Sequence, residues 1–263
     1  MTSTSDAPAG TAAGAGPVAD RLITGKEVTK RFKRGHKVLD AVDITVDTGE
    51  FVAIVGPSGC GKSTLLRLVS GLDKPSGGIL TMSARQIGYV FQDPALLPWR
   101  STIKNVELPG ELHGLSGSER RARAEEALAL VGLEAAASKL PRQLSGGMRM
   151  RAALARELTM RPDLFLFDEP FSAVDELTRG RLGSELEQIF LDQQFGALFV
   201  THSVSEAVRR ASRVLVMSRH GKVVEEIPVP LPYPRPPFTR VDAACAKVEE
   251  QVFRVLEREL ELT

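Results

Sequence analysis

Residues 55–64 read VGPSGCGKST, at the end of the apolar run FVAIV of residues 51–55. A short, fully apolar run of this kind is typical of a strand that is buried on both faces. After the glycines, residues 62–72 read KSTLLRLVSGL, where apolar residues recur at helical spacing and Gly71 ends the pattern. The glycine-rich segment is therefore predicted to join a buried strand to a helix.

This segment fits the pattern G-x-x-x-x-G-K-[ST], which is typical of a loop that binds phosphate. In such a loop backbone N–H groups surround an anion, and the following helix adds the positive end of its dipole. The lysine reaches the β- and γ-phosphates, and the serine hydroxyl ligates Mg²⁺. The alternative is a chance glycine-rich turn, which the strand–loop–helix context disfavours. The residues expected to bind the nucleotide are Gly56, Pro57, Ser58, Gly59, Cys60, Gly61, Lys62, Ser63 and Thr64.

A second apolar strand, LFLF at residues 164–167, is followed by Asp168 and Glu169. Besides the phosphate loop, such a site needs a carboxylate for the metal, and we expect Asp168 to hold Mg²⁺ through water. Glu169 is then placed to orient or polarise the attacking water. The alternative is a solvated strand end with two acids, which is less favoured beside a phosphate loop.

The remainder of the chain alternates strands with helices, which predicts an α/β fold with a parallel or mixed sheet and a helical insert. We expect a disordered tail at residues 1–20, a folded domain at 21–228 with the insert at about 93–160, and a Pro-rich linker with a terminal helix at 229–263. Strands are predicted at 22–32, 38–46, 51–55, 163–169, 196–202, 213–218 and 222–229, and helices at 62–70, 120–133, 145–160 and 176–193.

Composition narrows the class of protein. The 263 residues carry a net charge of +1, so no strong global field attracts nucleic acid or anionic lipid. No apolar run approaches the about 20 residues needed to cross a bilayer. The N-terminus lacks a signal pattern, and Cys60 and Cys245 are read as reduced thiols. We expect a cytosolic chain that another chain would hold at a membrane.

The sequence LSGG at residues 144–147 resembles the signature motif of ABC-transporter ATPase subunits. Gln92, residues 172–175 (SAVD) and His202 match that family's Q-loop, D-loop and switch histidine, so six motifs occur in the family's order. The resemblance implies a P-loop NTPase (RecA-like) core with a mixed sheet, an N-terminal antiparallel β-subdomain and an inserted α-helical signature subdomain. It also implies that ATP and Mg²⁺ are bound and that ATP is hydrolysed.

The resemblance assigns the signature to a composite site. Ser145, Gly146 and Gly147 would bind the γ-phosphate of ATP held by a second copy or by a paralogous subunit, and Asp175 would also contact the nucleotide. The exposed N–H groups at such a helix start suit an anion. The alternative is that Ser145 is simply a helix N-cap.

Three further roles follow from the same resemblance. Gln92 would touch Mg²⁺ or the attacking water, and His202 would contact the γ-phosphate and hold Glu169 in position. Phe32 stands where the family stacks an aromatic ring on adenine, and the alternative is that it packs in the core. Ser203 departs from the usual aspartate after the switch histidine, which we expect to weaken a local cap.

Residues 93–106, DPALLPWRSTIKNV, resemble the ATPases of bacterial importers for nitrate, sulfonate and taurine. There a coupling helix of the membrane permease would dock near Leu96, Leu97, Pro98 and Trp99. The alternative is that Leu96 and Trp99 are ordinary buried groups. The implied partners are permease subunits and, indirectly, a periplasmic or lipid-anchored solute-binding protein, at the cytoplasmic face of the membrane.

Two other classes of ABC ATPase remain as alternatives. One is the subunit of an exporter or lipid-transport system, which the LLPW segment disfavours. The other is a mechanical ATPase that acts on nucleic acid or ribosomes. Such proteins usually carry long coiled-coil inserts or two cassettes, and no basic stripe is found in this sequence. We therefore expect no nucleic-acid partner.

Overall fold

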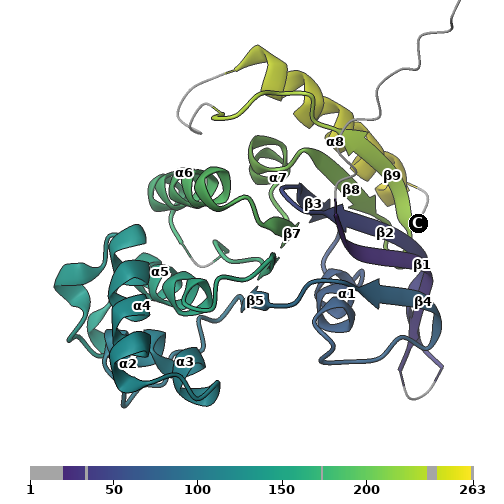
Figure 1. Cartoon of the computed structure of the whole chain (residues 1–263). Helices are drawn as coiled ribbons and strands as arrows, with labels where there is room; N and C mark the ends of the chain where they lie inside the picture. Colours follow the sequence, from purple (N-terminus) through teal and green to yellow (C-terminus); the bar gives the residue numbers. More distant parts are fainter. Residues whose placement is uncertain (1–19, 33–34, 173, 236–241, 262–263) are drawn as a thin grey trace, which may run out of the picture.

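The computed structural model of the chain describes residues 20–32, 35–172, 174–235 and 242–261. The tail predicted at residues 1–20 lies outside this range apart from Asp20, as does part of the predicted Pro-rich linker. The described residues form two β-sheets and a separate group of helices, which lies at the lower left of Figure 1.

The first sheet is antiparallel and has the strand order β2-β1-β4. Its strands are β1 (Arg21–Arg31), β2 (Lys37–Asp47) and β4 (Gly77–Met82). The first two were predicted, and the sheet is the N-terminal antiparallel β-subdomain that the resemblance implied. The third strand was missed because its six residues begin with two glycines and show no buried position.

The second sheet has the order β5-β6-β7-β3-β8-β9 and is parallel except for the pairing of β9 with β8. The mixed sheet is as predicted. Every residue of β3 and β7 is buried, which explains their continuous apolar sequences. The strands are β3 (Phe51–Val55), β5 (Ile87–Val90), β6 (Leu164–Asp168), β7 (Gly196–Val200), β8 (Arg213–Met217) and β9 (Val223–Pro228).

The helical insert lies between β5 and β6 in the chain. Ser116 caps its longest helix, accepting a hydrogen bond from the Glu119 N–H at 3.2 Å, as the capping pattern predicts. Leu128, Val131 and Leu133 are buried there, as expected. Two of its short helices were not predicted. The insert contains α2 (Thr102–Val106), α3 (Leu108–Leu112), α4 (Gly117–Leu130), α5 (Gly146–Leu158) and the 3₁₀ turns Glu134–Ala136 and Pro141–Gln143.

Four more helices cover the mixed sheet (Figure 1). The helix after β7 was not predicted, and it packs against the terminal helix, where the Ser205 hydroxyl donates to Glu249 Oε1 at 2.8 Å. Within the described residues, no helix has both the length and the apolar composition to span a bilayer. The four helices are α1 (Lys62–Val69), α6 (Glu176–Gln193), α7 (Val204–Arg210) and α8 (Ala243–Glu261).

The mixed sheet carries a hydrophobic core on each face, because side chains alternate between faces along a strand. Phe51, Phe167 and Phe199 belong to one core, which also contains buried residues of α5, α6, α7 and α8. Val52 and Ile54 belong to the other, with residues of α1 and of the antiparallel sheet. Because β5, β6, β7, β3 and β8 run parallel, their carboxyl ends meet at one edge of the sheet. Ligands of open α/β sheets bind at this edge.

Candidate active site

The phosphate loop runs from the end of β3 to the start of α1, and its glycines are required by close packing. A Cβ on Gly56 would lie 2.6 Å from the Met217 carbonyl oxygen. Gly61 has a φ of 107°, and a Cβ there would lie 2.8 Å from the Val38 carbonyl oxygen. Only glycine fits both positions without displacing backbone. Cys60 is buried between them, and burial raises the pKa of its thiol.

Lys62 begins α1 and is 5% exposed. Its Nζ donates hydrogen bonds to the carbonyl oxygens of Gly56 at 2.9 Å and Pro57 at 3.0 Å. The ammonium group is therefore held across the mouth of its own loop. A phosphate group within the loop would lie beside this positive charge and beside the N–H groups at the start of the helix.

Ser63 and Asp168 face each other although 105 residues separate them in the chain. The Ser63 hydroxyl donates to Asp168 Oδ1 at 2.7 Å. Burial raises the pKa of Asp168, and the hydrogen bond from Ser63 partly offsets that effect. A hydroxyl and a carboxylate are hard oxygen ligands of the kind that Mg²⁺ prefers. The two side chains therefore fit the metal role that the sequence indicates.

Tyr89 belongs to the same cluster and was missed by the sequence analysis. Its hydroxyl lies 3.5 Å from Asp168 Oδ2, and its ring stacks on Phe91 with centroids 4.0 Å apart. Burial, together with the charge of Asp168, raises the pKa of Tyr89, which therefore remains a neutral hydrogen-bond donor. The sequence signal was its position three residues before Gln92, at the end of a strand.

Glu169 follows β6 and adopts a left-handed backbone with a φ of 47°. Its N–H donates to the Val200 carbonyl at 3.0 Å, which ties this unusual conformation to the end of β7. His202 Nδ1 lies 3.4 Å from Glu169 Oε2. The structure thus brings His202 beside Glu169, the side chain that it was expected to hold in position.

Gln92 lies at the same edge of the sheet. In the parallel pairing of β5 with β6, Val90 is opposite Phe167, so Gln92 continues beside Asp168 and Glu169. Its side chain is exposed. Four loops, each following a parallel strand, therefore supply the expected catalytic and metal-binding side chains.

The signature residues lie elsewhere. Ser145 is exposed and caps α5, accepting from the Met148 N–H at 3.3 Å. Gly147 packs against α6, where a Cβ would lie 2.9 Å from the Thr178 side chain. Asp175 caps α6 by accepting from the Thr178 N–H at 3.0 Å. Figure 1 shows α5 in the helical insert, apart from α1. The helix that Ser145 caps therefore belongs to a different part of the chain from the helix that follows the phosphate loop.

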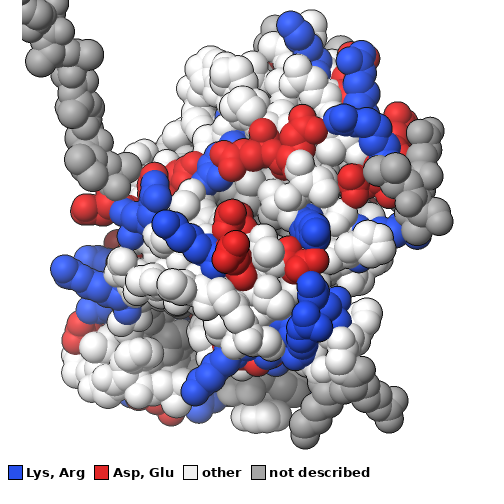
Figure 2. Space-filling model, turned by 90° about the vertical axis from the view of Figure 1, so that its right-hand side faces the viewer, with Lys and Arg blue, Asp and Glu red and all other residues white. Residues whose placement is uncertain are grey.

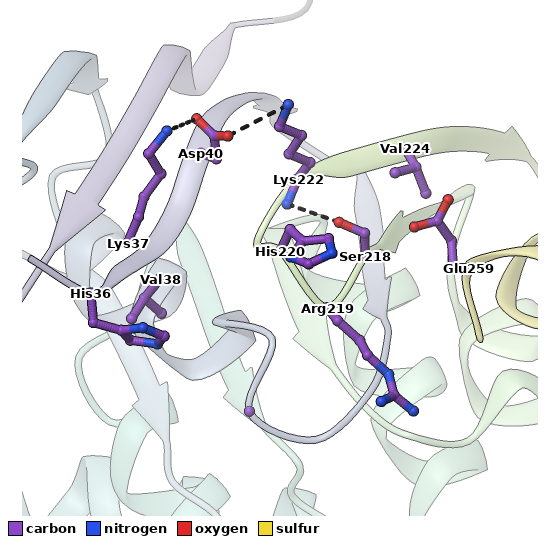
Figure 3. A pocket seen from close by; sticks show the side chains of 11 residues that line it. His36, Lys37, Val38, Asp40, Ser218, Arg219, His220, Lys222, Val224 and Glu259 are labelled. Atoms are coloured by element: carbon purple, nitrogen blue, oxygen red, sulfur yellow. Dashed lines mark hydrogen bonds and ion pairs between the residues drawn. The ribbon is translucent and has the colours of Figure 1, made fainter. Parts of the chain in front are cut away.

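Phe32 lies at the end of β1 and is 45% exposed, so the alternative that it packs in the core is wrong. Its N–H donates to the His36 carbonyl at 3.0 Å. His36 in turn lines a cavity of about 500 Å³ that reaches Gly59 of the phosphate loop. Figure 3 shows this cavity from close by. Its lining residues are His36, Lys37, Val38, Asp40, Gly59, Ser218, Arg219, His220, Lys222, Val224 and Glu259.

One wall of this cavity carries paired charges. Asp40 accepts from Lys37 Nζ at 2.7 Å and lies 3.5 Å from Lys222 Nζ. The cavity therefore borders the phosphate loop at Gly59, and its His36 wall is joined to Phe32 by a backbone hydrogen bond.

A phosphate loop between a buried strand and a helix, with hydroxyl, carboxylate and histidine groups beside it, defines a P-loop nucleoside triphosphatase. A family model described as ABC transporter matches residues 39–172. The chain belongs to the ABC transporter family, and it is an ATP-binding subunit with ATPase activity.

Curated relatives and solved structures agree with this assignment. An aliphatic sulfonates import ATP-binding protein of Mesorhizobium japonicum is 46% identical over 236 residues, which cover 87% of this chain and 86% of that protein. A protein of the same name from Burkholderia lata is 45% identical, with coverages of 90% and 73%. A dimeric ATP-binding cassette in a post-hydrolysis state with ADP and phosphate has a TM-score of 0.71 and 34% identity, covering 79% of this chain and 99% of that one. A cassette of a Clostridium perfringens ABC transporter complex has a TM-score of 0.74 and 27% identity, with coverages of 80% and 89%.

Proposed function

We propose that this chain is the ATPase subunit of an importer for a small sulfonate-type solute, and that it works as a dimer on the cytoplasmic face of the membrane. The observation that carries the ATPase part is the meeting of four strand-end loops, with Ser63 2.7 Å from Asp168 and His202 3.4 Å from Glu169. The names of the relatives, which describe sulfonate import, support the transport part.

In this proposal the phosphate loop and Lys62 bind the β- and γ-phosphates, and Phe32 stacks on the adenine. Ser63, Asp168 and Gln92 would hold Mg²⁺, which would balance the phosphate charge. Glu169 accepts a proton from the attacking water, and His202 keeps the Glu169 carboxylate in place. The short contact between His202 and Glu169 supports this division of roles.

The dimer follows from the position of the signature. Ser145 is exposed and caps a 13-residue helix of the helical insert, which is a different part of the chain from the phosphate loop. A second copy, arranged head to tail, would bring this helix start to the γ-phosphate and complete the site. A solved relative that is a dimer with ADP and phosphate supports dimer formation. The ATPase domain would then be residues 21–228.

The helical insert offers a surface for the permease. Trp99 is 73% exposed, so the alternative that it is buried is wrong, while Leu96 packs partly against the core. The Leu97 N–H donates to Asn105 Oδ1 at 2.6 Å, and Asn105 Nδ2 donates to the Leu97 carbonyl at 3.1 Å. The segment is thus pinned to the buried Asn105, and it presents a large aromatic side chain to solvent. Exposed apolar groups on a rigid support are typical of interaction sites.

Trp99→Ala is expected to weaken binding of the cognate permease by about tenfold or more. A tryptophan that becomes buried when two proteins bind often contributes much of the binding energy. Phe253→Ala is the matched control, because Phe253 is also an exposed aromatic residue, 49% accessible, but lies on α8. Both variants and the parent chain would be titrated against permease in nanodiscs. Equal affinity of the Trp99 variant and the parent would contradict the docking surface.

The solute class has its own test. In the assembled complex with permease and binding protein, we expect alkanesulfonates to stimulate ATP hydrolysis, because the importer must couple solute delivery to turnover. Taurine, which is an aminoalkanesulfonate, belongs to the same test set, and nitrate and an unrelated amino acid serve as comparisons. Stimulation by nitrate but by no sulfonate, or no stimulation by any of them, would contradict the proposed solute class.

The face shown in Figure 2 is relevant to the mechanical alternative. Acidic and basic side chains both occur there: acidic ones gather across the middle of the face, and a group of basic ones lies below them. Nucleic-acid binding depends on a basic stripe for most of its affinity. The charge on this face is therefore mixed, and the support for a transport role comes from the names of the relatives, which describe import.

A further inference from the structure

Glu206 is an unusual residue for its surroundings, because it is a carboxylate with 4% of its side chain exposed. It lies in α7, four residues after His202. The Thr201 hydroxyl donates to Glu206 Oε2 at 2.6 Å, and this bond is buried. A buried carboxylate needs such partners, since an unpaired one is strongly destabilising.

Glu206 contacts both neighbours of His202, Thr201 through its carboxylate and Ser203 through its backbone N–H. The Ser203 N–H donates to the Thr201 hydroxyl oxygen at 3.0 Å, and the Glu206 N–H donates to the Ser203 hydroxyl oxygen at 3.3 Å. The cap that Ser203 was expected to weaken is therefore made. His202 is held between two residues that are both bonded to Glu206.

Arg179 connects this arrangement to a different loop. Its Nε lies 3.5 Å from Glu206 Oε1, and its Nη2 donates to the Val174 carbonyl at 3.0 Å. Arg179 belongs to α6, and Val174 lies just before that helix, in the segment that resembles the D-loop. One guanidinium group thus joins the segment before α6 to the loop of His202. The planar fork of arginine suits two simultaneous contacts in this way, and the point charge of lysine does not.

We propose that Arg179 is a positioning residue for ATP hydrolysis, which acts through Glu206 and Thr201 to fix His202 against Glu169. The inference rests on the role given to His202 in the proposed function. The alternative is that Arg179 only fastens α6 to α7. The two readings differ in what happens to the His202 ring when the arginine is removed.

Loss of Arg179 should leave the fold intact. Arg210 lies close to Glu206, its Nη1 donating to the Glu206 carbonyl at 3.3 Å, and it supplies a second positive charge. Burial lowers the pKa of Arg210 to about 10, an effect that Glu206 partly offsets, so the arginine remains charged at neutral pH. The Arg179→Ala variant therefore loses the link to Val174 without leaving the carboxylate unbalanced.

We expect Arg179→Ala to lower kcat by about 10- to 100-fold, since small displacements of catalytic groups have effects of this size. KM for MgATP should change less than about twofold, because Arg179 does not contact the phosphate loop. Arg179→Lys should recover part of the lost kcat, because lysine can reach one of the two partners. Arg181→Ala is the matched control. Arg181 is on the same helix with 71% of its side chain exposed, and it pairs only loosely with Glu185 at 3.5 Å.

A second measurement observes His202 directly. The chain has 4 histidines, so a histidine-labelled sample gives few ring signals, and His202→Ala identifies the relevant one. We expect Arg179→Ala to shift the His202 ring signal and to leave the other three in place. Glu206→Gln keeps an acceptor for Thr201 but loses the charge that faces Arg179, and it should shift the same signal. Arg181→Ala should shift none.

The outcomes separate the inference from the function on which it rests. If Arg179→Ala is folded, with an unchanged His202 signal or with kcat within about twofold of the parent, the positioning role is wrong. If His202→Ala itself retains full turnover, the role proposed for His202 fails first. Should Arg179→Ala not fold, the Glu206→Gln variant decides the question by the same two measurements.

Discussion

Replacing Glu169 with glutamine is expected to lower ATP turnover by about 10²- to 10⁴-fold, the usual contribution of a general base. The amide has nearly the shape of the carboxylate but cannot accept the proton of the attacking water. His202 Nδ1, now 3.4 Å from Glu169 Oε2, would retain a polar neighbour. Binding of MgATP should persist, because Glu169 is not part of the phosphate loop.

The same variant should accumulate as a dimer with MgATP, since nucleotide that cannot be cleaved would hold Ser145 of one copy against the site of the other. Turnover and size-exclusion profiles with and without MgATP check both effects. Glu257→Gln on α8 is the control, because Glu257 is exposed and far along the chain from the site. A Glu169→Gln protein that elutes as a monomer with bound MgATP would contradict the proposed dimer. One that hydrolyses ATP at the parental rate would contradict the role of Glu169 as general base.

Lys62→Ala should weaken MgATP binding by about 100-fold. Hydrogen bonds to charged groups are worth about 1.5–3 kcal/mol each, and about 1.4 kcal/mol corresponds to a tenfold change in affinity. The lysine is 5% exposed and already lies across the loop, so its ammonium group is positioned before the nucleotide arrives. Calorimetric titration with ATP and Mg²⁺ measures the loss.

Two controls accompany the Lys62 experiment. Lys247→Ala removes an exposed lysine from α8 and should leave affinity unchanged. Thermal unfolding of Lys62→Ala without nucleotide shows whether the Gly56 and Pro57 carbonyls tolerate the loss of their donor. A folded Lys62→Ala protein with parental affinity for ATP would rule out the phosphate loop as the nucleotide site.

The strands that the sequence predicted best are those with continuous apolar sequences, which are typical of strands buried on both faces. FVAIV and LFLF are continuous apolar runs, and both proved to be buried central strands. β5 was missed because it has four residues and includes Gly88, whose absent side chain makes room for the Phe165 ring. α7 was missed because its seven residues are too few to show a clear helical period, and it begins directly after the histidine loop.

The candidate site could be located from the sequence as far as backbone topology determines it. Lys62 follows a predicted strand, Asp168 and His202 lie at the ends of two others, and the carboxyl ends of parallel strands meet at one edge. Tertiary partners could not be read in this way. The contact of Tyr89 with Asp168, and that of Arg179 with Glu206, join segments whose spacing in the chain carries no signal. The exposure of Phe32 and Trp99 likewise depends on packing rather than on residue type.

The position of β3 has a consequence for the order in which the protein matures during translation. Both hydrogen-bonding neighbours of this strand, β7 and β8, are synthesised more than a hundred residues later. A nascent chain arrested before residue 196 thus carries the whole nucleotide-binding motif on an unpaired strand. We expect the motif to bind its ligand only after Met217 has left the ribosomal tunnel, because only then can β8 pair with β3 and support the loop.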